Sequence, residues 1–263
     1  MLNGKVCLVT GAAEGIGRAT SIEMARQGAR AVVLADLDEN SGREAAALVE
    51  RAGAKALFVR IDARQAADLR AMVDAAVSTF GGLDVLHNNV GVLEASFTDQ
   101  LTVDVLPEDV WETVYQVNLR SYFLATKYAA PHLKASLNGP AIVNSASVSG
   151  LVAYPSGPAY AATKGAVIQL TKATAVDLAP TVRCNCFCPG ATETAMMRRY
   201  LETADDPADL VRMMSATHLV PRPGRPEEIA KLACFLASDD ASFINGGVYV
   251  IDGGSLAWRG TNA

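Results

Sequence analysis

The sequence predicts an α/β fold in which a doubly wound, seven-stranded parallel sheet carries helices on both faces. Short runs rich in β-branched residues alternate along the chain with longer segments of helical periodicity. The short runs are apolar almost throughout, as expected for strands that are covered on both sides. A glycine-rich turn follows the first run and opens the first helical segment. Strands and helices that alternate in this way give parallel pairing with right-handed crossovers.

Each element follows from its own pattern. The near-continuous apolar runs predict strands, which lie at Lys5–Thr10, Ala31–Ala35, Ala56–Ile61, Val85–Asn88, Ala141–Ser145, Val182–Phe187 and Val248–Ile251. Segments with apolar residues three and four positions apart predict helices, which lie at Ile16–Gln27, Ser41–Ala52, Ala66–Phe80, Pro107–Ala130, Ala159–Leu178 and Pro226–Ala237. The 263 residues contain no tandem repeat and no Pro/Ser-rich linker, so we expect a single domain over 1–263.

Two long stretches interrupt the alternation. Val92–Leu106 follows the fourth strand, and Ala191–Pro223 follows the sixth. Long insertions in compact folds are often lids or binding loops, and sheets of this kind bind ligands beyond the carboxyl ends of their strands. We therefore expect a substrate-binding lid around 191–223, with a surface helical hairpin over the core as the alternative. The apolar residues of this segment favour an apolar ligand; they are Met196, Met197, Tyr200, Leu201, Met213, Met214 and Leu219.

Composition restricts the partners and the compartment. The net charge is −5 and no cluster of five basic residues occurs, which argues against nucleic acid as a partner. The apolar stretches are shorter than the roughly 20 residues that a membrane helix needs. The N-terminus enters a strand directly, without the pattern of an export signal. Five cysteines, an odd number, suit free thiols in a reducing compartment. We expect a cytoplasmic protein.

The turn TGAAEGIG at 10–17 is a candidate nucleotide site. Its glycines permit a tight turn and a close approach of a pyrophosphate to the backbone. The N-terminus of the following helix offers free N–H groups and the positive end of a dipole. Any tight strand-to-helix turn uses glycine, and the spacing G-x-x-x-G-x-G differs from the commoner G-x-G-x-x-G. Its place between the first strand and the first helix nevertheless favours a dinucleotide.

Acidic residues near this turn favour NAD over NADP. Asp36 ends the second expected strand, where a carboxylate accepts hydrogen bonds from ribose hydroxyls and repels a 2′-phosphate. Glu14 adds negative charge within the turn, and Leu37 rather than an arginine follows Asp36. The alternative role for Asp36 is to cap the next helix. Asp62, which ends the third strand, is expected either to cap a helix that begins near Gln65 or to bind adenine.

Amides follow the fourth strand in Asn88-Asn89-Val90-Gly91. Side-chain amides at that place can join neighbouring strand ends, and Gly91 leaves room for a bound ring. A plain turn is the alternative.

Tyr160 and Lys164 lie one helical turn apart and share a face. A phenol ordinarily has a pKa near 10, and a neighbouring ammonium lowers that pKa toward the working range. Such a tyrosine can exchange a proton with an alcohol or a carbonyl. Ser147, thirteen residues before Tyr160, can hold the same oxygen. Singly, these residues are more often a solvated helix face and a cap; together with a nucleotide turn they predict a proton-transfer site.

These motifs together resemble the short-chain dehydrogenase/reductase family over essentially the whole chain. The resemblance is carried by TGAAEGIG at 10–17, NNVG at 88–91, VNL at 117–119, IVNSASVSG at 142–150, YAATK at 160–164 and PGATET at 189–194. The C-terminal third is also similar to that family. The resemblance implies a Rossmann-like fold and a homotetramer, paired through the helices that hold Asn118 and Tyr160 and through the last helix and strand.

The resemblance further implies roles for single residues. Tyr160 is the implied general acid/base, Lys164 lowers its pKa and holds the nicotinamide ribose, Ser147 polarises the substrate oxygen, and Asn118 fixes a water in the proton relay. With the acidic turn residues above, the expected cofactor-binding set is Gly11, Glu14, Gly15, Ile16, Gly17, Asp36, Leu37, Asp62, Ala63, Asn89, Gly91, Tyr160, Lys164, Pro189, Gly190, Thr192 and Thr194.

Departures from the family pattern are small. Val90 stands where the family usually has alanine, and Thr192 stands where it has valine or isoleucine. Ser145 competes with Ser147 for the catalytic role, and the spacing to Tyr160 selects Ser147.

Three cysteines alternate on the sixth strand and so point to one face; they are Cys184, Cys186 and Cys188. This pattern invites a metal, but no histidine nearby in the sequence completes a tetrahedral set. We expect buried thiols and no metal.

The sequence therefore predicts an NAD-dependent oxidoreductase that interconverts an apolar or cyclic secondary alcohol and its ketone by hydride transfer. Three lid arginines, Arg198, Arg199 and Arg212, leave open an NADPH-dependent 3-ketoacyl-carrier-protein reductase, against which Asp36 and Glu14 count. A non-catalytic dinucleotide-sensing protein is a further alternative, against which the intact catalytic set counts.

Overall fold

The strands form one parallel sheet at the centre of the molecule. The computed structural model describes residues 1–202 and 206–258, and in that part of the chain the sheet has seven strands in the order β3-β2-β1-β4-β5-β6-β7. The strands are β1 Val6–Thr10, β2 Ala31–Asp36, β3 Lys55–Arg60, β4 Val85–Asn88, β5 Ala141–Ser145, β6 Arg183–Pro189 and β7 Val248–Ile251. This order winds outward from β1 in both directions, and the predicted fold class is confirmed.

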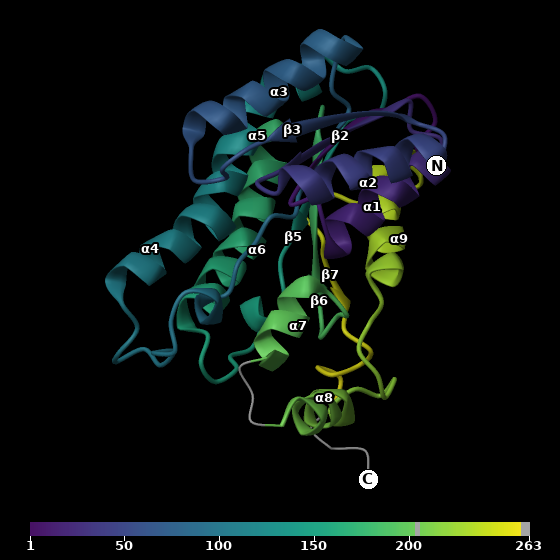
Figure 1. Cartoon of the computed structure of the whole chain (residues 1–263). Coiled ribbons are helices and arrows are strands. Elements are labelled where there is room, and N and C mark those ends of the chain that lie inside the picture. Colours follow the sequence, from purple (N-terminus) through teal and green to yellow (C-terminus); the bar gives the residue numbers. More distant parts are fainter. Residues whose placement is uncertain (203–205, 259–263) are drawn as a thin grey trace.

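Helices cover both faces of the sheet (Figure 1). One face carries α1 Gly15–Arg26, α2 Glu39–Arg51 and α9 Pro226–Ala237, and the other carries α3 Ala66–Phe80, α5 Ser121–Ala135 and α6 Pro158–Leu178. The shorter α4, Glu108–Tyr115, leads into α5. Two further helices, α7 Ala195–Glu202 and α8 Pro207–Ala216, lie beyond the end of β6.

The core follows from the two-residue period of the strands. Along β1, Val6 and Leu8 pack with residues of α3, α5 and α6, whereas Cys7 and Val9 pack with residues of α1, α2 and α9. All four are fully buried. Because successive side chains of a strand point to opposite faces, one apolar run serves two layers. Each buried aliphatic side chain of this kind stabilises the fold by roughly 1.5–3 kcal/mol.

The predicted helix Pro107–Ala130 is instead divided into three parts. After α4 comes one π-helical turn, η2 Gln116–Arg120, and then α5, which continues past Pro131 to Ala135. A π turn adds a residue to the helical repeat and is frequent at functional sites. Pro131 lies inside α5, where it has no N–H to donate to the preceding turn.

The insertion after β6 begins and ends at neighbouring points. Thr192 forms a parallel β-bridge with Gly224. The amide of Gly224 donates to the carbonyl of Ala191 over 2.8 Å, and the amide of Glu193 donates to the carbonyl of Gly224 over 2.9 Å. The segment that holds α7 and α8 is therefore joined at its base, in the position where the sequence predicts the lid.

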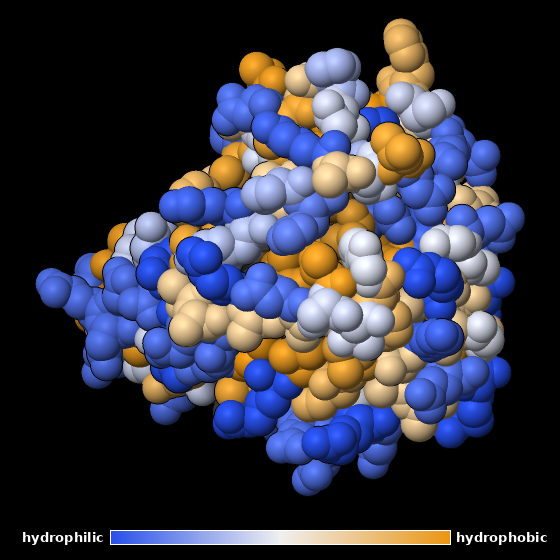
Figure 2. Space-filling model, turned by 90° about the horizontal axis from the view of Figure 1, so that it is seen from above, coloured by the Kyte–Doolittle hydropathy of each residue, from blue (hydrophilic) through white to orange (hydrophobic). Residues whose placement is uncertain are grey.

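The surface and the cysteines add two observations. Seen from above, a hydrophobic area in the middle of the face is framed by hydrophilic residues (Figure 2). Among the described helices, none has an apolar stretch long enough to cross a membrane. The five cysteines are free and buried, and three of them lie on β6.

The buried imidazole of His87 makes the stability of the fold depend on pH. His87 lies on β4, and its Nδ1 is 3.0 Å from the carbonyl oxygen of Val143 on β5. Burial lowers the pKa of His87 to about 4, from an ordinary value of 6.5, although the contact with Val143 opposes part of this shift. Between these two values the unfolded chain binds a proton that the folded protein does not.

We expect the free energy of unfolding to fall as the pH drops from 6.5 to about 4, because in that window protonation favours the unfolded chain. His87→Gln cannot titrate, so the wild type should lose up to about 3 kcal/mol more than this variant across the window. Urea unfolding at both ends of the window measures the difference, with His132→Gln as the control for removing an imidazole. Equal acid losses in wild type and His87→Gln would contradict the expectation.

Candidate active site

A cleft of about 1190 Å³ runs along the carboxyl ends of the strands. Its wall includes the glycine turn, the ends of β2 to β6, the start of α6 and the segment of α7 and α8. Sheets of this type bind ligands at this edge. The predicted site residues that line the cleft are Gly11, Glu14, Gly15, Ile16, Asp36, Leu37, Asp62, Ala63, Asn89, Gly91, Ser147, Tyr160, Lys164, Pro189, Gly190, Thr192 and Thr194. In the described structure Gly17 and Asn118 lie behind this lining.

The glycine turn has the shape that a pyrophosphate requires. Gly11 has a φ of +64°, in the left-handed region that glycine favours. A Cβ at Gly17 would overlap the carbonyl oxygen of Gly11, so Gly17 lets α1 pack directly against the turn. Glu14 precedes α1, and among the described residues its side chain makes no capping hydrogen bond. The first amides of α1 therefore face the cleft without a side-chain cap, which suits a bound phosphate. These residues fit a dinucleotide.

Asp36 supports the turn from the end of β2. Its Oδ2 accepts a hydrogen bond from the amide of Ala13 over 2.9 Å, and its Oδ1 accepts one from the amide of Asp38 over 3.1 Å. The helix cap of α2 is Asp38, whose carboxylate accepts from the amide of Ser41. The capping role considered for Asp36 thus belongs to Asp38, and Asp36 remains on the wall of the cleft.

The residues at the ends of β3 and β4 have definite partners. Asp62 pairs with Arg64 over 2.7 Å, and this hydrogen bond lowers the pKa of Asp62. Gln65 occupies the N-cap position of α3, so the cap considered for Asp62 is not what the structure has. Asn88 donates to the side chain of Asn144 on β5, and Asn89 donates to the carbonyls of the glycine turn. The amides do join neighbouring strand ends.

Ser147, Tyr160 and Lys164 meet in the same cleft. Lys164, on α6, is 3% exposed. Its Nζ donates to the carbonyl oxygen of Ser145 over 2.7 Å and lies 5.6 Å from the centre of the Tyr160 ring. The Ser147 hydroxyl, two residues past the end of β5, accepts a hydrogen bond from the Ser149 amide over 3.0 Å and interacts with the Tyr160 phenol so as to lower its pKa. A hydroxyl, a phenol and an ammonium are therefore gathered at one wall of the cleft.

The acid–base balance of this group differs from the sequence-based expectation. Burial raises the pKa of Tyr160 above its ordinary value, and the hydrogen bond with Ser147 opposes part of that rise. Burial also lowers the pKa of Lys164 to about 7. The expected lowering of the Tyr160 pKa by the ammonium is not found. The hydrogen bonds of Lys164 Nζ go to the Ser145 carbonyl and, over 3.4 Å, to the Tyr122 hydroxyl rather than to Tyr160. Burial is the largest influence on the pKa values of both Tyr160 and Lys164.

Asn118 holds the floor of the site through the backbone of Val92. Its amide nitrogen donates to the carbonyl of Val92 over 2.9 Å, and its amide oxygen accepts from the Val92 amide over 2.8 Å. A Cβ on Gly91 would come within 3.6 Å of Lys164 Nζ and 3.5 Å of the Asn118 oxygen. Asn118, Gly91 and Lys164 are therefore neighbours, although the Asn118 side chain is occupied by backbone.

Sequence reasoning missed three residues of the site. Tyr122, fully buried on α5, donates to the carbonyls of Val90 and Ser145 and lies beside Lys164. Glu94 and Tyr154 line the cleft. Glu94 belongs to no recognisable motif, and Tyr122 occupies what looks like an ordinary apolar position of a helix. The sequence therefore gives little indication that Glu94 or Tyr122 belongs to the site.

The lid segment contributes apolar side chains to the cleft. Met196 and Met197 of α7 and Leu210 of α8 line it. Arg199 of α7 lies 3.5 Å from Glu14 in the glycine turn, so the segment reaches across the cleft to the nucleotide side. The predicted lid residues Tyr200, Met213 and Met214 have side chains outside the described residues.

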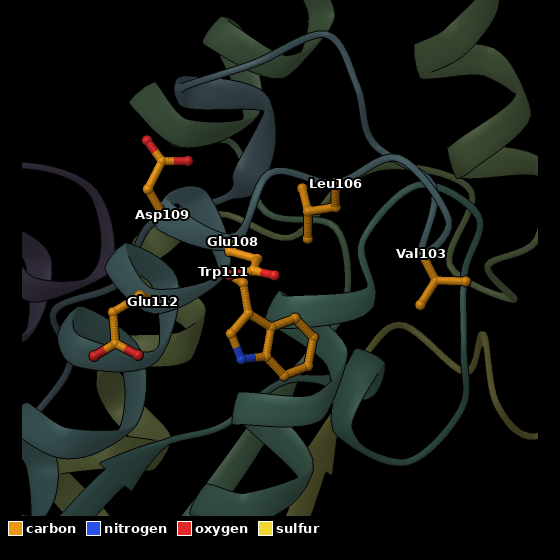
Figure 3. A pocket seen from close by; sticks show the side chains of 6 residues that line it. All are labelled: Val103, Leu106, Glu108, Asp109, Trp111 and Glu112. Atoms are coloured by element: carbon orange, nitrogen blue, oxygen red, sulfur yellow. The ribbon is translucent and has the colours of Figure 1, made fainter.

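A second hollow of about 630 Å³ lies at the start of α4 (Figure 3). The Trp111 indole and the Leu106 side chain lie on the side of α4 nearer Val103, while the carboxylates of Asp109 and Glu112 lie on the other side. Its lining is Val103, Leu106, Glu108, Asp109, Trp111 and Glu112. The predicted catalytic residues all lie elsewhere, so the cleft is the candidate active site.

The sheet order and the glycine turn beside an acid–base cluster define a dinucleotide-binding oxidoreductase. Comparison with known proteins supports this class. A family model described as enoyl-(acyl carrier protein) reductase matches residues 11–255. Cyclohexanol dehydrogenase of Acinetobacter sp. strain SE19 is 37% identical over 253 residues, covering 95% of this chain and 94% of that protein. Cyclopentanol dehydrogenase of Comamonas testosteroni is 37% identical over 257 residues, covering 97% and 98%. The chain belongs to the short-chain dehydrogenase/reductase family.

A solved structure supports the same assignment. The crystal structure of levodione reductase superposes with a TM-score of 0.91 at 30% sequence identity, covering 98% of this chain and 100% of that one. Membership of the family implies an NAD(P) dinucleotide as cofactor.

Gly17→Ala tests whether the glycine turn at 10–17 holds the dinucleotide. The new Cβ would overlap the Gly11 carbonyl oxygen and displace the turn. Overpacking of this kind costs about 1–3 kcal/mol, so we expect NADH and NADPH to bind at least about tenfold more weakly. Fluorescence titration of the reduced dinucleotide measures this. Gly82→Ala is the matched control, since a Cβ there meets none of the described atoms within 4 Å. An unchanged affinity of Gly17→Ala for NADH and NADPH would show that the dinucleotide does not bind at the glycine turn.

Proposed function

We propose that this protein is an NAD-dependent oxidoreductase that interconverts a secondary alcohol, apolar or cyclic, and its ketone. One observation carries the proposal: Ser147, Tyr160 and Lys164 line the same cleft as the glycine turn. A proton-transfer group placed beside a dinucleotide site is what reversible alcohol oxidation requires.

The chain's own residues would move the proton and hold the substrate. Bound NAD⁺ supplies the acceptor for the hydride. The Ser147 hydroxyl holds the substrate oxygen, and the Tyr160 phenolic oxygen takes its proton during oxidation or returns it during reduction. Lys164 stabilises the deprotonated phenol electrostatically when it is itself charged. With a pKa of about 7, Lys164 exchanges protons in the neutral range, so it can also pass the proton onward.

The cofactor preference rests on charge at the end of β2. Asp36 and Glu14 both line the cleft, and a carboxylate there repels a 2′-phosphate. The nearby Arg18 is engaged by the backbone, since its Nε donates to the carbonyl of Ala13 over 2.6 Å and its NH2 to that of Ser41 over 3.3 Å. These contacts favour NAD over NADP.

The substrate class rests on the lining of the lid and on the relatives. Met196, Met197 and Leu210 present apolar surface to the cleft, and flexible thioethers suit a loosely shaped apolar ligand. The printed names of two relatives refer to cyclohexanol and cyclopentanol. Both observations favour a cyclic or apolar alcohol, with residues 191–223 acting as the lid of a single domain.

The 3-ketoacyl-carrier-protein reductase is the weaker alternative. It would draw on Arg198, Arg199 and Arg212 for the carrier, but Arg199 pairs with Glu14 and Arg212 pairs with Asp209. It would also require NADPH beside two carboxylates. A non-catalytic sensor would not need the buried lysine, whose desolvation is costly. The alcohol–ketone assignment accounts for more of the site.

We further propose a cytoplasmic homotetramer. Apolar side chains are exposed on α4, which leads into the turn that holds Asn118, and on α6, which holds Tyr160; they include Trp111 at 42% and Val176 at 77%, and Val250 of β7 is 47% exposed. Burial of such residues against a second copy would remove apolar area from water. Sedimentation of the purified protein tests this proposal.

Tyr160→Phe is the direct test of the proposed chemistry. It removes the proton-transfer hydroxyl and keeps the ring, so we expect at least about a hundredfold loss of kcat for alcohol oxidation, with NADH affinity and Tm retained. The rate of NADH formation with cyclohexanol, cyclopentanol and open-chain secondary alcohols measures this. Tyr115→Phe, at an exposed position of α4, is the matched control. Near-normal turnover in Tyr160→Phe would refute the assignment.

Asp36→Asn combined with Leu37→Arg tests the cofactor preference. The asparagine keeps an acceptor for the Ala13 amide but removes the negative charge, and the arginine adds a partner for a 2′-phosphate. We expect the ratio of kcat/KM for NADP⁺ over NAD⁺ to rise by at least about tenfold. An unchanged ratio, or a wild type that already prefers NADP⁺, would contradict the role given to Asp36.

A further inference from the structure

A buried carboxylate stands beside the candidate catalytic tyrosine. Glu94 opens the short helix η1, Glu94–Ser96, in the stretch that follows β4. Its side chain is 1% exposed although it contributes to the wall of the cleft. Buried carboxylates are rare unless a partner compensates the lost hydration. The partners of Glu94 therefore indicate why it is there.

The partner is the backbone of Tyr160 itself. Oε1 of Glu94 accepts a hydrogen bond from the Tyr160 amide over 2.7 Å. Tyr160 is the third residue of α6, which begins at Pro158 after Gly157. The first amides of a helix lack acceptors within the helix, and the positive end of the helix dipole favours an anion. Glu94 thus caps α6 from an element 66 positions away in sequence.

The position of Glu94 also connects α6 with the substrate side of the cleft. Leu93, Ala95 and Phe97, which flank Glu94, line the cleft as well. In the described structure η1 contacts both α4 and the lid helix α7. One side chain therefore joins the wall that would face the substrate to the turn that carries the phenol.

Several groups interact electrostatically with the Tyr160 phenol. Lys164 lies one turn further along α6, Ser147 comes from the end of β5, Cys188 from β6, Tyr122 from α5 and Glu94 from η1. The negative charge of Glu94 raises the pKa of Tyr160, after the larger effect of burial. Glu94 thus acts on the phenol both through the backbone and through its charge.

We infer that Glu94 is a positioning residue for Tyr160: its carboxylate fixes the first turn of α6 and thereby sets where the phenol lies in the cleft. This inference rests on the proposed function, because Tyr160 matters here as the acid/base of the reaction. It assigns a role to a residue that the sequence motifs do not mark.

Two substitutions separate the hydrogen bond from the charge. Glu94→Gln keeps an oxygen that can accept from the Tyr160 amide but removes the charge. Glu94→Ala removes both. Glu50→Gln is the matched control, because Glu50 is an exposed acid near the end of α2. The pH profile of kcat/KM for alcohol oxidation, the plateau kcat, the NADH affinity and Tm are measured for each.

We expect Glu94→Gln to keep the plateau kcat within about threefold and to move the midpoint of the pH profile to lower pH, because a charge that opposes the phenolate is gone. Glu94→Ala should lower the plateau kcat at least about tenfold, since the first turn of α6 is no longer fixed. NADH affinity should stay at the wild-type value in both. A purely structural role would lower the Tm of Glu94→Ala and leave its plateau kcat at the Glu94→Gln value, and that result would overturn the inference.

A second readout keeps this test independent of turnover. The tyrosinate absorbance of Tyr160 is obtained by subtracting the titration of Tyr160→Phe from that of the wild type, and likewise in the Glu94→Gln background. The same subtraction is made in the Glu94→Ala background. Both variants lack the charge, so a midpoint that differs between them reports the lost hydrogen bond to the Tyr160 amide and supports the inference even if no alcohol is oxidised, whereas equal midpoints overturn it. Failure of the wild type to oxidise any alcohol would defeat only the proposed function.

Discussion

The burial of Lys164 is the constraint on which the rest of the site depends. The ammonium of Lys164 is compensated by three elements: the Ser145 carbonyl from β5, the Tyr122 hydroxyl from α5 and the Tyr160 ring from its own helix. A buried charge without such partners is very unfavourable. Even with them, burial lowers the pKa of Lys164 to about 7. The packing of β5, α5 and α6 is therefore also what sets the chemistry of the cleft.

The acid–base character of the cleft results from burial first and from neighbouring charges second. Lys164 and Glu94 both interact with Tyr160 and carry charges of opposite sign, yet the direction of the Tyr160 pKa shift follows burial. A sequence-based argument that counts only the adjacent ammonium gives the opposite sign. The glycine turn on the nucleotide side depends on backbone instead, through the close contact of Gly17 with Gly11. Burial of titratable side chains therefore governs one half of the cleft, and close backbone packing governs the other half.

The sequence was sufficient wherever the controlling interaction is local. Apolar runs predicted the seven strands, and the turn at 10–17 and the pair Tyr160 and Lys164 were found from spacing alone. It was insufficient where partners are distant in the chain. The π turn at Gln116–Arg120 has no signature in periodicity, and the contact of Glu94 with Tyr160 spans 66 positions. Asp38, two positions after Asp36, caps α2, because only the residue directly before the helix is placed to accept from its first amides.

The joined base of the lid segment has a consequence for how far that segment can vary. The bridge between Thr192, before α7, and Gly224, after α8, brings the two ends of the insertion together. Closing a loop whose ends already meet becomes only slightly less favourable as the loop grows, by about 0.6 kcal/mol per doubling of its length. The segment can therefore change in length and sequence at little cost in stability. Its sequence can diverge while the sheet that carries the glycine turn keeps its geometry.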